Sequence, residues 1–203
     1  VTAVICIPIE NQDVDKRVPL TPESVALLVS YGYRVLVQAG AGLTINYSDT
    51  YYAESGAEIV DTAREVLQAD IILKILPPTL EEVEMMRRGT VVFSFLYLFK
   101  LSKPLLELML RKRINAAAYE LMCDETGVSP FVTTISEIDG SSSITLAAEL
   151  LSNSNGGKGI LLGGIPGISP TEVVIIGAGV AGAMAARSAL AMGASVKVFD
   201  NDI

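Results

Sequence analysis

This sequence contains no histidine and only two cysteines among its 203 residues. Cys6 falls in an apolar segment and Cys123 near an expected turn, and the two lack the short spacing of zinc ligands. Without histidine or paired cysteines, the sequence predicts no metal site. Two isolated thiols are typical of reduced cysteines, which indicates a cytoplasmic protein.

Positive charge is also scarce, since 15 lysines and arginines stand against 23 acidic residues, for a net charge of −8. This balance argues against nucleic acid or an anionic membrane surface as a partner. The most apolar stretch, Val91 to Leu110, is interrupted by Lys100, Lys103 and Pro104, so its continuous part is too short to span a bilayer. We recognise no signal peptide in this sequence, which starts with valine, and expect no membrane insertion in this segment.

The most informative part of the sequence lies near its end. An apolar segment, Val173 to Ile176, leads into Gly177, Gly179 and Gly182, followed by an Ala-rich helical segment and a second strand that ends at Asp200. Gly177 permits a tight turn, Gly179 lets the backbone approach a pyrophosphate, and Gly182 lets the helix pack closely on the strand. Free N–H groups at the helix start would face the phosphates.

Asp200 follows Gly182 by 18 residues, where a carboxylate can accept both hydroxyls of an adenosine ribose. Its charge would repel a 2′-phosphate, which favours NAD over NADP. The order of strand, glycines, helix, strand and acid is much more specific than the glycines alone. The alternative is a glycine-rich turn that only packs a strand against a helix. The cofactor-binding residues expected here are Gly177, Ala178, Gly179, Val180, Ala181, Gly182 and Asp200.

The rest of the sequence alternates short strand-like and helix-like segments, which predicts an α/β fold with mainly parallel sheets. Helix starts are marked by capping residues, as in the Thr-x-x-Glu capping box that begins at Thr79. Helical spacing from Ser136 to Leu151 predicts a long helix that joins two Rossmann-like domains, residues 1–135 and residues 136–203. Only three residues follow Asp200, so we expect the second, NAD-binding domain to be truncated. The other expected strands are residues 3–8, 33–38, 70–75, 91–95 and 116–119.

Ordered blocks of the sequence resemble the alanine dehydrogenases and the NAD-binding α subunits of proton-translocating transhydrogenases. The likeness begins at Glu10 to Pro22 and runs to the glycine loop, so it covers essentially the whole chain. Tyr119-Glu120, Ser136-Glu137 and the run from Gly156 to Gly164 are closer to alanine dehydrogenase, whereas Phe95-Leu96-Tyr97 is closer to the transhydrogenases. The other matching blocks are Gly40 to Gly42, Tyr47 to Asp49, Ala57-Glu58 and Ala69 to Lys74.

The resemblance implies an oxidoreductase that uses NAD to convert L-alanine to pyruvate and ammonia. Arg17 matches the family arginine that grips the substrate carboxylate, and Lys74 matches the lysine that holds the substrate oxygen. The alternatives are a surface ion pair for Arg17 and a snorkelling side chain for Lys74. Glu120 would support substrate binding unless it is simply exposed. Ser136 would contact the nicotinamide side of the cofactor, and it could equally be the N-cap of the long helix.

Tyr97 stands where alanine dehydrogenases have the histidine that moves the proton accompanying hydride transfer. The ordinary pKa of tyrosine, ~10, would have to fall strongly for it to take this role. A neighbouring Lys74 could lower that pKa, or could itself serve as the base if it were desolvated. The apolar run around Tyr97 favours a core aromatic instead.

Two other functions fit the same resemblance. One is the NAD(H)-binding α subunit of a transhydrogenase, which a membrane-spanning segment after the second domain would favour. The other is a module that binds NAD without chemistry. The family further implies a homo-oligomer, a dimer or a hexamer, with a small-molecule substrate. We expect the 203-residue chain alone to be inactive, because the nicotinamide half of the pocket would lie outside it.

Overall fold

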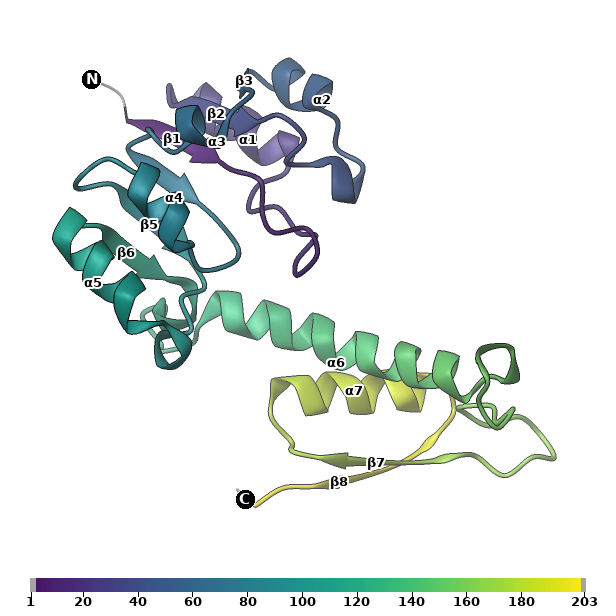
Figure 1. The fold of residues 1–203 in the computed structure, drawn as a ribbon. Helices are drawn as coiled ribbons and strands as arrows, with labels where there is room; N and C mark the ends of the chain where they lie inside the picture. Colours follow the sequence, from purple (N-terminus) through teal and green to yellow (C-terminus); the bar gives the residue numbers. More distant parts are fainter. Residues whose placement is uncertain (1–2, 202–203) are drawn as a thin grey trace. The chain divides into compact units, whose positions relative to one another are not determined.

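The computed structural model describes residues 3–201, which divide into two compact units. Unit 1 ends at Met122 and unit 2 begins at Cys123, and both units combine strands with helices (Figure 1). None of the helices within residues 3–201 is long and apolar enough to cross a membrane.

The described part of unit 1 contains six parallel strands: β1 (Val4–Ile7), β2 (Arg34–Gln38), β3 (Glu58–Val60), β4 (Ile71–Leu73), β5 (Val91–Ser94) and β6 (Asn115–Ala118). Their order in the sheet is β3-β2-β1-β4-β5-β6. Strands β2 and β3 extend the sheet on one side of β1, and strands β4 to β6 extend it on the other side. The strand order therefore reverses between β1 and β4. This is the arrangement of a Rossmann-like sheet, in which ligands bind beyond the carboxyl ends of the strands at the reversal. The predicted α/β class and parallel sheet are confirmed.

Helices begin in unit 1 where the sequence places capping residues. Thr21, Ser48, Thr62 and Thr79 each accept a hydrogen bond from a backbone N–H in the first turn of the following helix, which replaces a missing helical partner. The α-helices are α1 (Pro22–Ser30), α2 (Asp49–Glu54), α3 (Ala63–Val66), α4 (Leu80–Met85) and α5 (Lys103–Lys112). The 3-10 helices are η1 (Leu43–Ile45), η2 (Leu98–Lys100) and η3 (Tyr119–Leu121).

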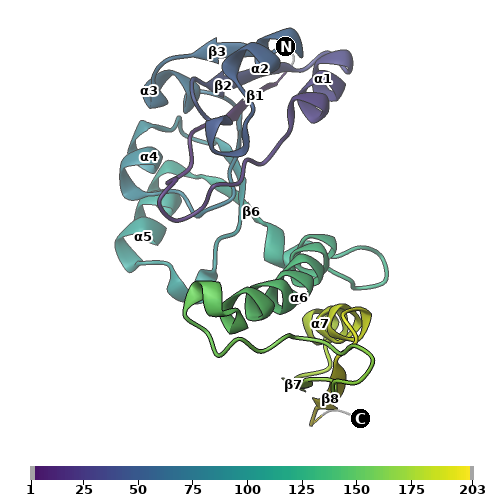
Figure 2. The same cartoon turned by 90° about the vertical axis from the view of Figure 1, so that its right-hand side faces the viewer.

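Alternate residues of the strands face opposite sides of this sheet and enter two apolar cores. On one side, Cys6, Ile72 and Val92 share a register and pack with residues of α3, α4 and α5. On the other side, Ile5 and Val35 pack with residues of α1 and α2. Figure 2 shows α3, α4 and α5 on the left of the sheet and α1 on its right. With both faces covered, the carboxyl edge of the sheet is the natural place for a site.

Unit 2 contains, among its described residues, a βαβ element and one long helix. Strands β7 (Glu172–Ile176) and β8 (Ser195–Phe199) pair in parallel and are joined by α7 (Val180–Ala191). Helix α6 (Pro130–Leu151) lies beside α7 in both views and is followed by η4 (Asn153–Asn155) (Figures 1 and 2). Gly140 of α6 permits this close approach, because a Cβ there would lie 2.2 Å from the carbonyl oxygen of Ala181.

Helix α6 begins six residues earlier than the helical spacing indicates. Ser129 precedes the helix and Pro130 occupies its first turn, where a missing N–H has no consequence. Ser136 therefore lies inside the helix, and its interpretation as an N-cap is wrong. Because all of α6 belongs to unit 2, the break between the compact units precedes the boundary predicted between residues 135 and 136.

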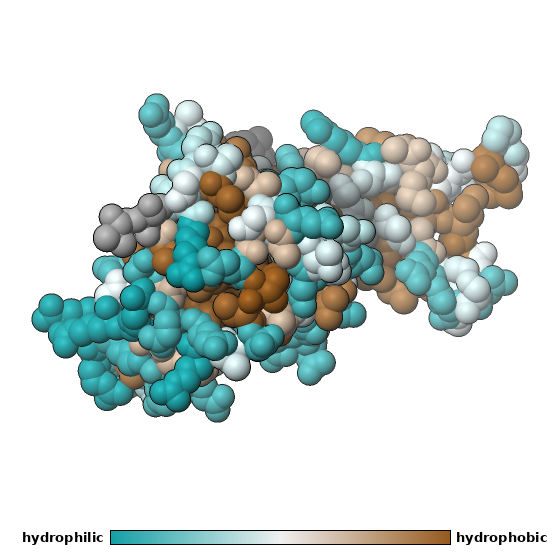
Figure 3. Space-filling view, turned by 90° about the horizontal axis from the view of Figure 1, so that it is seen from above, coloured by the Kyte–Doolittle hydropathy of each residue, from teal (hydrophilic) through white to brown (hydrophobic). Residues whose placement is uncertain are grey.

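The ribbon formed by β7 and β8 has one covered and one uncovered face. Val173 and Ile175 enter the core that α6 and α7 complete, whereas Val174, Ile176 and Phe199, the partner of Ile176, are exposed on the other face. In a complete doubly wound sheet, helices cover both faces. Elsewhere on the molecule, hydrophobic groups also reach the surface between hydrophilic ones (Figure 3).

Candidate functional site

Lys74 lies directly after β4, at the carboxyl edge of the sheet and beside the reversal in strand order. Its backbone N–H donates to the carbonyl of Phe93 in β5 at 2.9 Å, which continues the sheet past the last residue of the strand. The side chain is buried, with an exposed fraction of 3%. Glu10 follows β1 by three residues and reaches the same place from the other side of the reversal. The fold thus brings two charged residues together that are far apart in the sequence.

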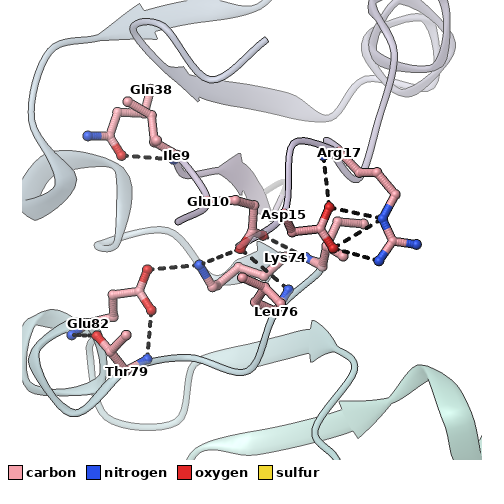
Figure 4. A network of polar contacts seen from close by, with 10 residues as sticks. Ile9, Glu10, Asp15, Arg17, Gln38, Lys74, Leu76, Thr79 and Glu82 are labelled. Atoms are coloured by element: carbon pink, nitrogen blue, oxygen red, sulfur yellow. Dashed lines mark hydrogen bonds and ion pairs between the residues drawn. The ribbon is translucent and has the colours of Figure 1, made fainter. Parts of the chain in front are cut away.

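Two carboxylates hold the Lys74 ammonium group (Figure 4). Nζ lies 2.8 Å from Oε1 of Glu82 and 3.2 Å from Oε2 of Glu10. An ammonium group has three N–H donors, so these two contacts leave one donor for the oxygen of a ligand. The interpretation of Lys74 as a snorkelling side chain is wrong, because its charged end is buried and paired.

Glu10 also orders the chain that follows Lys74. Its Oε1 accepts the N–H of Ile75 at 2.6 Å, and its Oε2 accepts the N–H of Leu76 at 3.4 Å. Burial raises the pKa of the Glu10 carboxyl, and Lys74 with these hydrogen bonds opposes the rise. The sequence interpretation gave Glu10 no role, although its place just after a buried strand was the signal that could have identified it.

Glu82 joins Lys74 to the start of helix α4. Its Oε2 accepts the backbone N–H of Thr79 at 2.7 Å, while Oε1 accepts from Lys74. The sequence predicted the capping box but not this second contact. One carboxylate therefore stabilises the helix start and the buried ammonium group at once.

The raised pKa of Glu10 predicts a specific dependence of stability on pH. Above pH 4.5, the ordinary pKa of a glutamate carboxyl, Glu10 holds more protons in the folded state than in the unfolded state. Rising pH therefore lowers the contribution of Glu10 to the unfolding free energy. That contribution is complete below about pH 4.5 and declines until the pH passes the folded pKa. The advantage of the wild type over Glu10→Gln should therefore shrink as pH rises.

Urea unfolding of both proteins between about pH 4 and pH 7 measures this difference. The other carboxyls are present in both proteins, so their contributions cancel in the difference between the two unfolding free energies. This includes carboxyls whose lowered pKa values act in the opposite direction, namely those of Asp15, Glu58, Asp70 and Asp124. An advantage that grows with pH would mean that the attraction of Lys74 outweighs the effect of burial.

Arg17 lies between β1 and α1, and its guanidinium makes a bidentate contact with the carboxylate of Asp15 (Figure 4). Nε donates to Oδ1 at 3.0 Å, and Nη2 donates to Oδ2 at 2.6 Å. This contact lowers the pKa of the Asp15 carboxyl. The Arg17 side chain is about half exposed. The ion pair considered as the alternative for Arg17 is present. Since Asp15 binds the guanidinium as an incoming carboxylate would, a ligand carboxylate could take its place.

Tyr97 follows β5 on the same edge of the sheet, and its interpretation as a core aromatic is wrong. Its exposed fraction is 45%, while the preceding Phe95 and Leu96 are buried. The backbone of Tyr97 is left-handed, with φ 47° and ψ 56°, and this turn directs the chain away from the core.

Glu120 is not simply exposed either, because its carboxylate accepts hydrogen bonds from the backbone N–H groups of Leu96 and Tyr97.

The glycine loop of unit 2 joins β7 to α7. Gly177 has φ 104°, and Gly182 allows the helix to start close to the turn, because a Cβ there would lie 1.9 Å from the carbonyl oxygen of Gly177. A Cβ at Gly177 or Gly179 would meet only open space, so the loop leaves room for a ligand. Asp200 follows β8 and accepts a hydrogen bond from the N–H of Ala178.

This loop fits a diphosphate group. The first turn of α7 begins at Val180 and presents N–H groups without helical partners beside the open loop. The carboxylate of Asp200 lies at the tip of the adjoining strand, where the ribose of a dinucleotide is bound in this type of βαβ element. Ser136 is half-buried within α6.

The two cysteines lie in different environments and form no disulfide. Burial raises the pKa of Cys6 to about 12, so this thiol stays protonated, and Cys123 is exposed and unpaired. Within residues 3–201, no three side chains of histidine, cysteine, aspartate or glutamate gather as metal ligands.

Two family models match the chain. The N-terminal domain model of alanine dehydrogenase/PNT matches residues 6–138, and the corresponding C-terminal domain model matches residues 143–203. Alanine dehydrogenase from Mycolicibacterium smegmatis is 42% identical over 201 residues, which are 98% of this chain and 54% of the relative. The chain thus spans about half the length of the curated relatives that it matches.

Solved structures show the same likeness. An L-alanine dehydrogenase superposes with a TM-score of 0.91 at 34% identity, over 97% of this chain and 54% of that protein. A transhydrogenase from Sinorhizobium meliloti superposes with a TM-score of 0.87 at 27% identity, over 98% of this chain and 59% of that protein. The family and the Rossmann-like fold together indicate a nucleotide cofactor.

Proposed function

We propose that this chain, which belongs to the alanine dehydrogenase/PNT family, is part of an NAD-dependent alanine dehydrogenase. The observation that carries the proposal is the buried Lys74 at the strand-order reversal, with one N–H donor beyond those taken by Glu10 and Glu82. A positive charge with one donor available at that edge suits the oxygen of a small 2-oxo acid. The overall reaction would convert L-alanine, NAD⁺ and water to pyruvate, ammonium, NADH and a proton.

Lys74 and Arg17 would divide the recognition of the substrate. Lys74 would donate its remaining N–H to the oxygen that becomes the carbonyl oxygen of pyruvate. Arg17 would exchange the Asp15 carboxylate for the substrate carboxylate, which a guanidinium binds through two parallel hydrogen bonds. The exchange replaces one carboxylate with another, so the arginine never loses a charged partner.

The nucleotide would bind at the glycine loop of unit 2. Backbone N–H groups of Val180 and Ala181 would hold the diphosphate. Ala178, whose N–H donates to Asp200, would keep this carboxylate beside the loop, where it would accept the ribose hydroxyls. The carboxylate of Asp200 would repel a 2′-phosphate, which favours NAD over NADP. When bound, NAD supplies the acceptor for the hydride from the α-carbon of alanine. Ser136 would contact the nicotinamide side of the cofactor, as the family resemblance implies.

The full-length protein provides the test. A spectrophotometric assay with NAD and a panel of L-amino acids should give NADH with L-alanine, and calorimetry should give a lower Kd for NAD than for NADP. Hydride transfer from NADH to an NADP analogue without any amino acid would instead support a transhydrogenase. Tight binding of NAD with no turnover of any amino acid would support a binding module, and either result would contradict the proposal.

Tyr97 gives a prediction specific to this chain. In the proposed enzyme it stands at the position of the family histidine, whose ordinary pKa of ~6.5 suits proton transfer near neutral pH. Tyr97→His should therefore raise kcat for L-alanine at pH 7, by roughly tenfold or more, since general acid–base catalysis contributes about 10² or more. Tyr97→Phe is the control that keeps the ring without an ionisable group. An unchanged kcat in Tyr97→His would mean that proton transfer does not limit turnover at this position.

A further inference from the structure

The loop after β5 adopts a conformation that needs support. Tyr97 is left-handed, with φ 47° and ψ 56°, a region that few residues other than glycine adopt and that is unfavourable for a bulky side chain. Such a conformation persists only when the surrounding structure holds it. The residue is also about half exposed, so burial of its ring does not hold it in place.

Glu120 supplies the support from the neighbouring strand. Its Oε1 accepts the N–H of Tyr97 at 2.7 Å and that of Leu96 at 3.1 Å, and its Oε2 accepts the N–H of Leu96 at 3.2 Å. Glu120 belongs to η3, which directly follows β6, and β6 pairs with β5 through Ser94 and Ala118. The two loops therefore leave the sheet side by side. Hydrogen bonds to a carboxylate are stronger than those between neutral groups.

Aromatic packing holds the ring itself. The Tyr97 ring stacks on Phe95 with centroids 5.8 Å apart and an interplanar angle of 17°. Phe95 in turn meets the buried ring of Tyr119 edge-to-face, with centroids 5.3 Å apart. The exposed ring is thus presented on a rigid support at the carboxyl edge of the sheet, while the adjacent Glu120 fixes its backbone.

We infer that Glu120 is a positioning residue: it holds the backbone of Leu96 and Tyr97 so that the Tyr97 ring faces the substrate of the proposed function, on which this inference rests. Both oxygens of Glu120 already accept backbone N–H groups. These hydrogen bonds direct the carboxylate at the backbone of the Tyr97 loop. The residue therefore acts through Tyr97 rather than on the substrate.

Glu120→Ala, Glu120→Gln and Glu107→Ala in the full-length protein test this inference. Glutamine keeps an oxygen that can accept both N–H groups, whereas Glu107 is an exposed acid of α5 that serves as a control. In Glu120→Ala, amide hydrogen exchange of Leu96 and Tyr97 should accelerate at least about tenfold. The kcat for L-alanine should fall at least about tenfold, with KM nearly unchanged, since Arg17 and Lys74 remain in place. Glu120→Gln should show smaller changes than Glu120→Ala, because it keeps the hydrogen bonds in a weaker, neutral form. Glu107→Ala should stay close to the wild type in both measurements.

The two measurements separate this inference from the proposed function. Accelerated exchange with an unchanged kcat, or unchanged exchange in Glu120→Ala, would overturn the positioning role. A loss in Glu120→Gln as large as in Glu120→Ala would also overturn it, because the charge and not the hydrogen bonds would then matter. If the wild type shows no turnover of alanine, the proposed function fails, and accelerated exchange still establishes that Glu120 holds the loop.

Discussion

Lys74→Met should lower the free energy of unfolding by about 3–5 kcal/mol at pH 7, because it leaves the buried Glu10 facing Glu82 without the positive charge between them. Glu10 is buried as completely as Lys74 and would have to lose its charge or its place. Urea unfolding monitored by circular dichroism measures this change. In the full-length protein, the same substitution should abolish turnover, since it removes the donor proposed for the substrate oxygen.

Two further variants show whether the lost stability comes from the unpaired buried charges or from the change in side-chain packing. Adding Glu10→Gln to Lys74→Met removes one of the unpaired charges and should restore a large part of the lost stability. Lys103→Met removes an exposed lysine whose ammonium lies 3.8 Å from Glu107, and it should leave the stability almost unchanged. If Lys74→Met unfolded no more easily than Lys103→Met, the ion pairs of Lys74 with Glu10 and Glu82 would not stabilise the fold.

Gly182→Ala and Gly179→Ala should each weaken NAD binding by roughly a hundredfold or more, for different reasons. A Cβ at Gly182 would lie 1.9 Å from the backbone carbonyl of Gly177, so the loop must move and unit 2 must lose stability. A Cβ at Gly179 meets no atom within 4 Å, and its φ of −63° suits alanine, so folding should be unaffected. That Cβ would occupy the open space left for the diphosphate.

Calorimetric titration with NAD and thermal unfolding of the full-length protein test this pair. Only Gly182→Ala should lower Tm, whereas both variants should lose affinity. Gly167→Ala is not a suitable control, because φ there is 86° and strains alanine by itself. NAD affinity equal to that of the wild type in Gly179→Ala would show that the ligand does not approach the backbone of this loop.

Local sequence signals identified most of the elements, but the short edge strand β3 (Glu58–Val60) was not among the expected strands. Capping threonines marked the starts of α1, α3 and α4, and β-branched runs marked the central strands. The glycine pattern and the acid at residue 200 predicted the βαβ element of unit 2, because the spacing from strand to glycine turn to helix to second strand is itself specific. The predicted start of α6 is six residues late because the helical spacing of apolar residues is clear only from Ser136, whereas the helix begins at Pro130 after Ser129.

The sequence by itself determined the class of fold, the family and the place of the glycine loop, which follow from local patterns and from ordered blocks of residues. The family resemblance is also the ground on which roles for Lys74 and Arg17 were expected. The tertiary structure alone decided their partners. Glu10 meets Lys74 because β1 and β4 are neighbours in the sheet, and Glu120 reaches Tyr97 because β5 and β6 are neighbours. Glu82 meets Lys74 because the start of α4 lies beside the end of β4. The physical reason is that a sheet places the ends of its strands side by side according to their order in space, and this order is not contained in any local stretch of sequence.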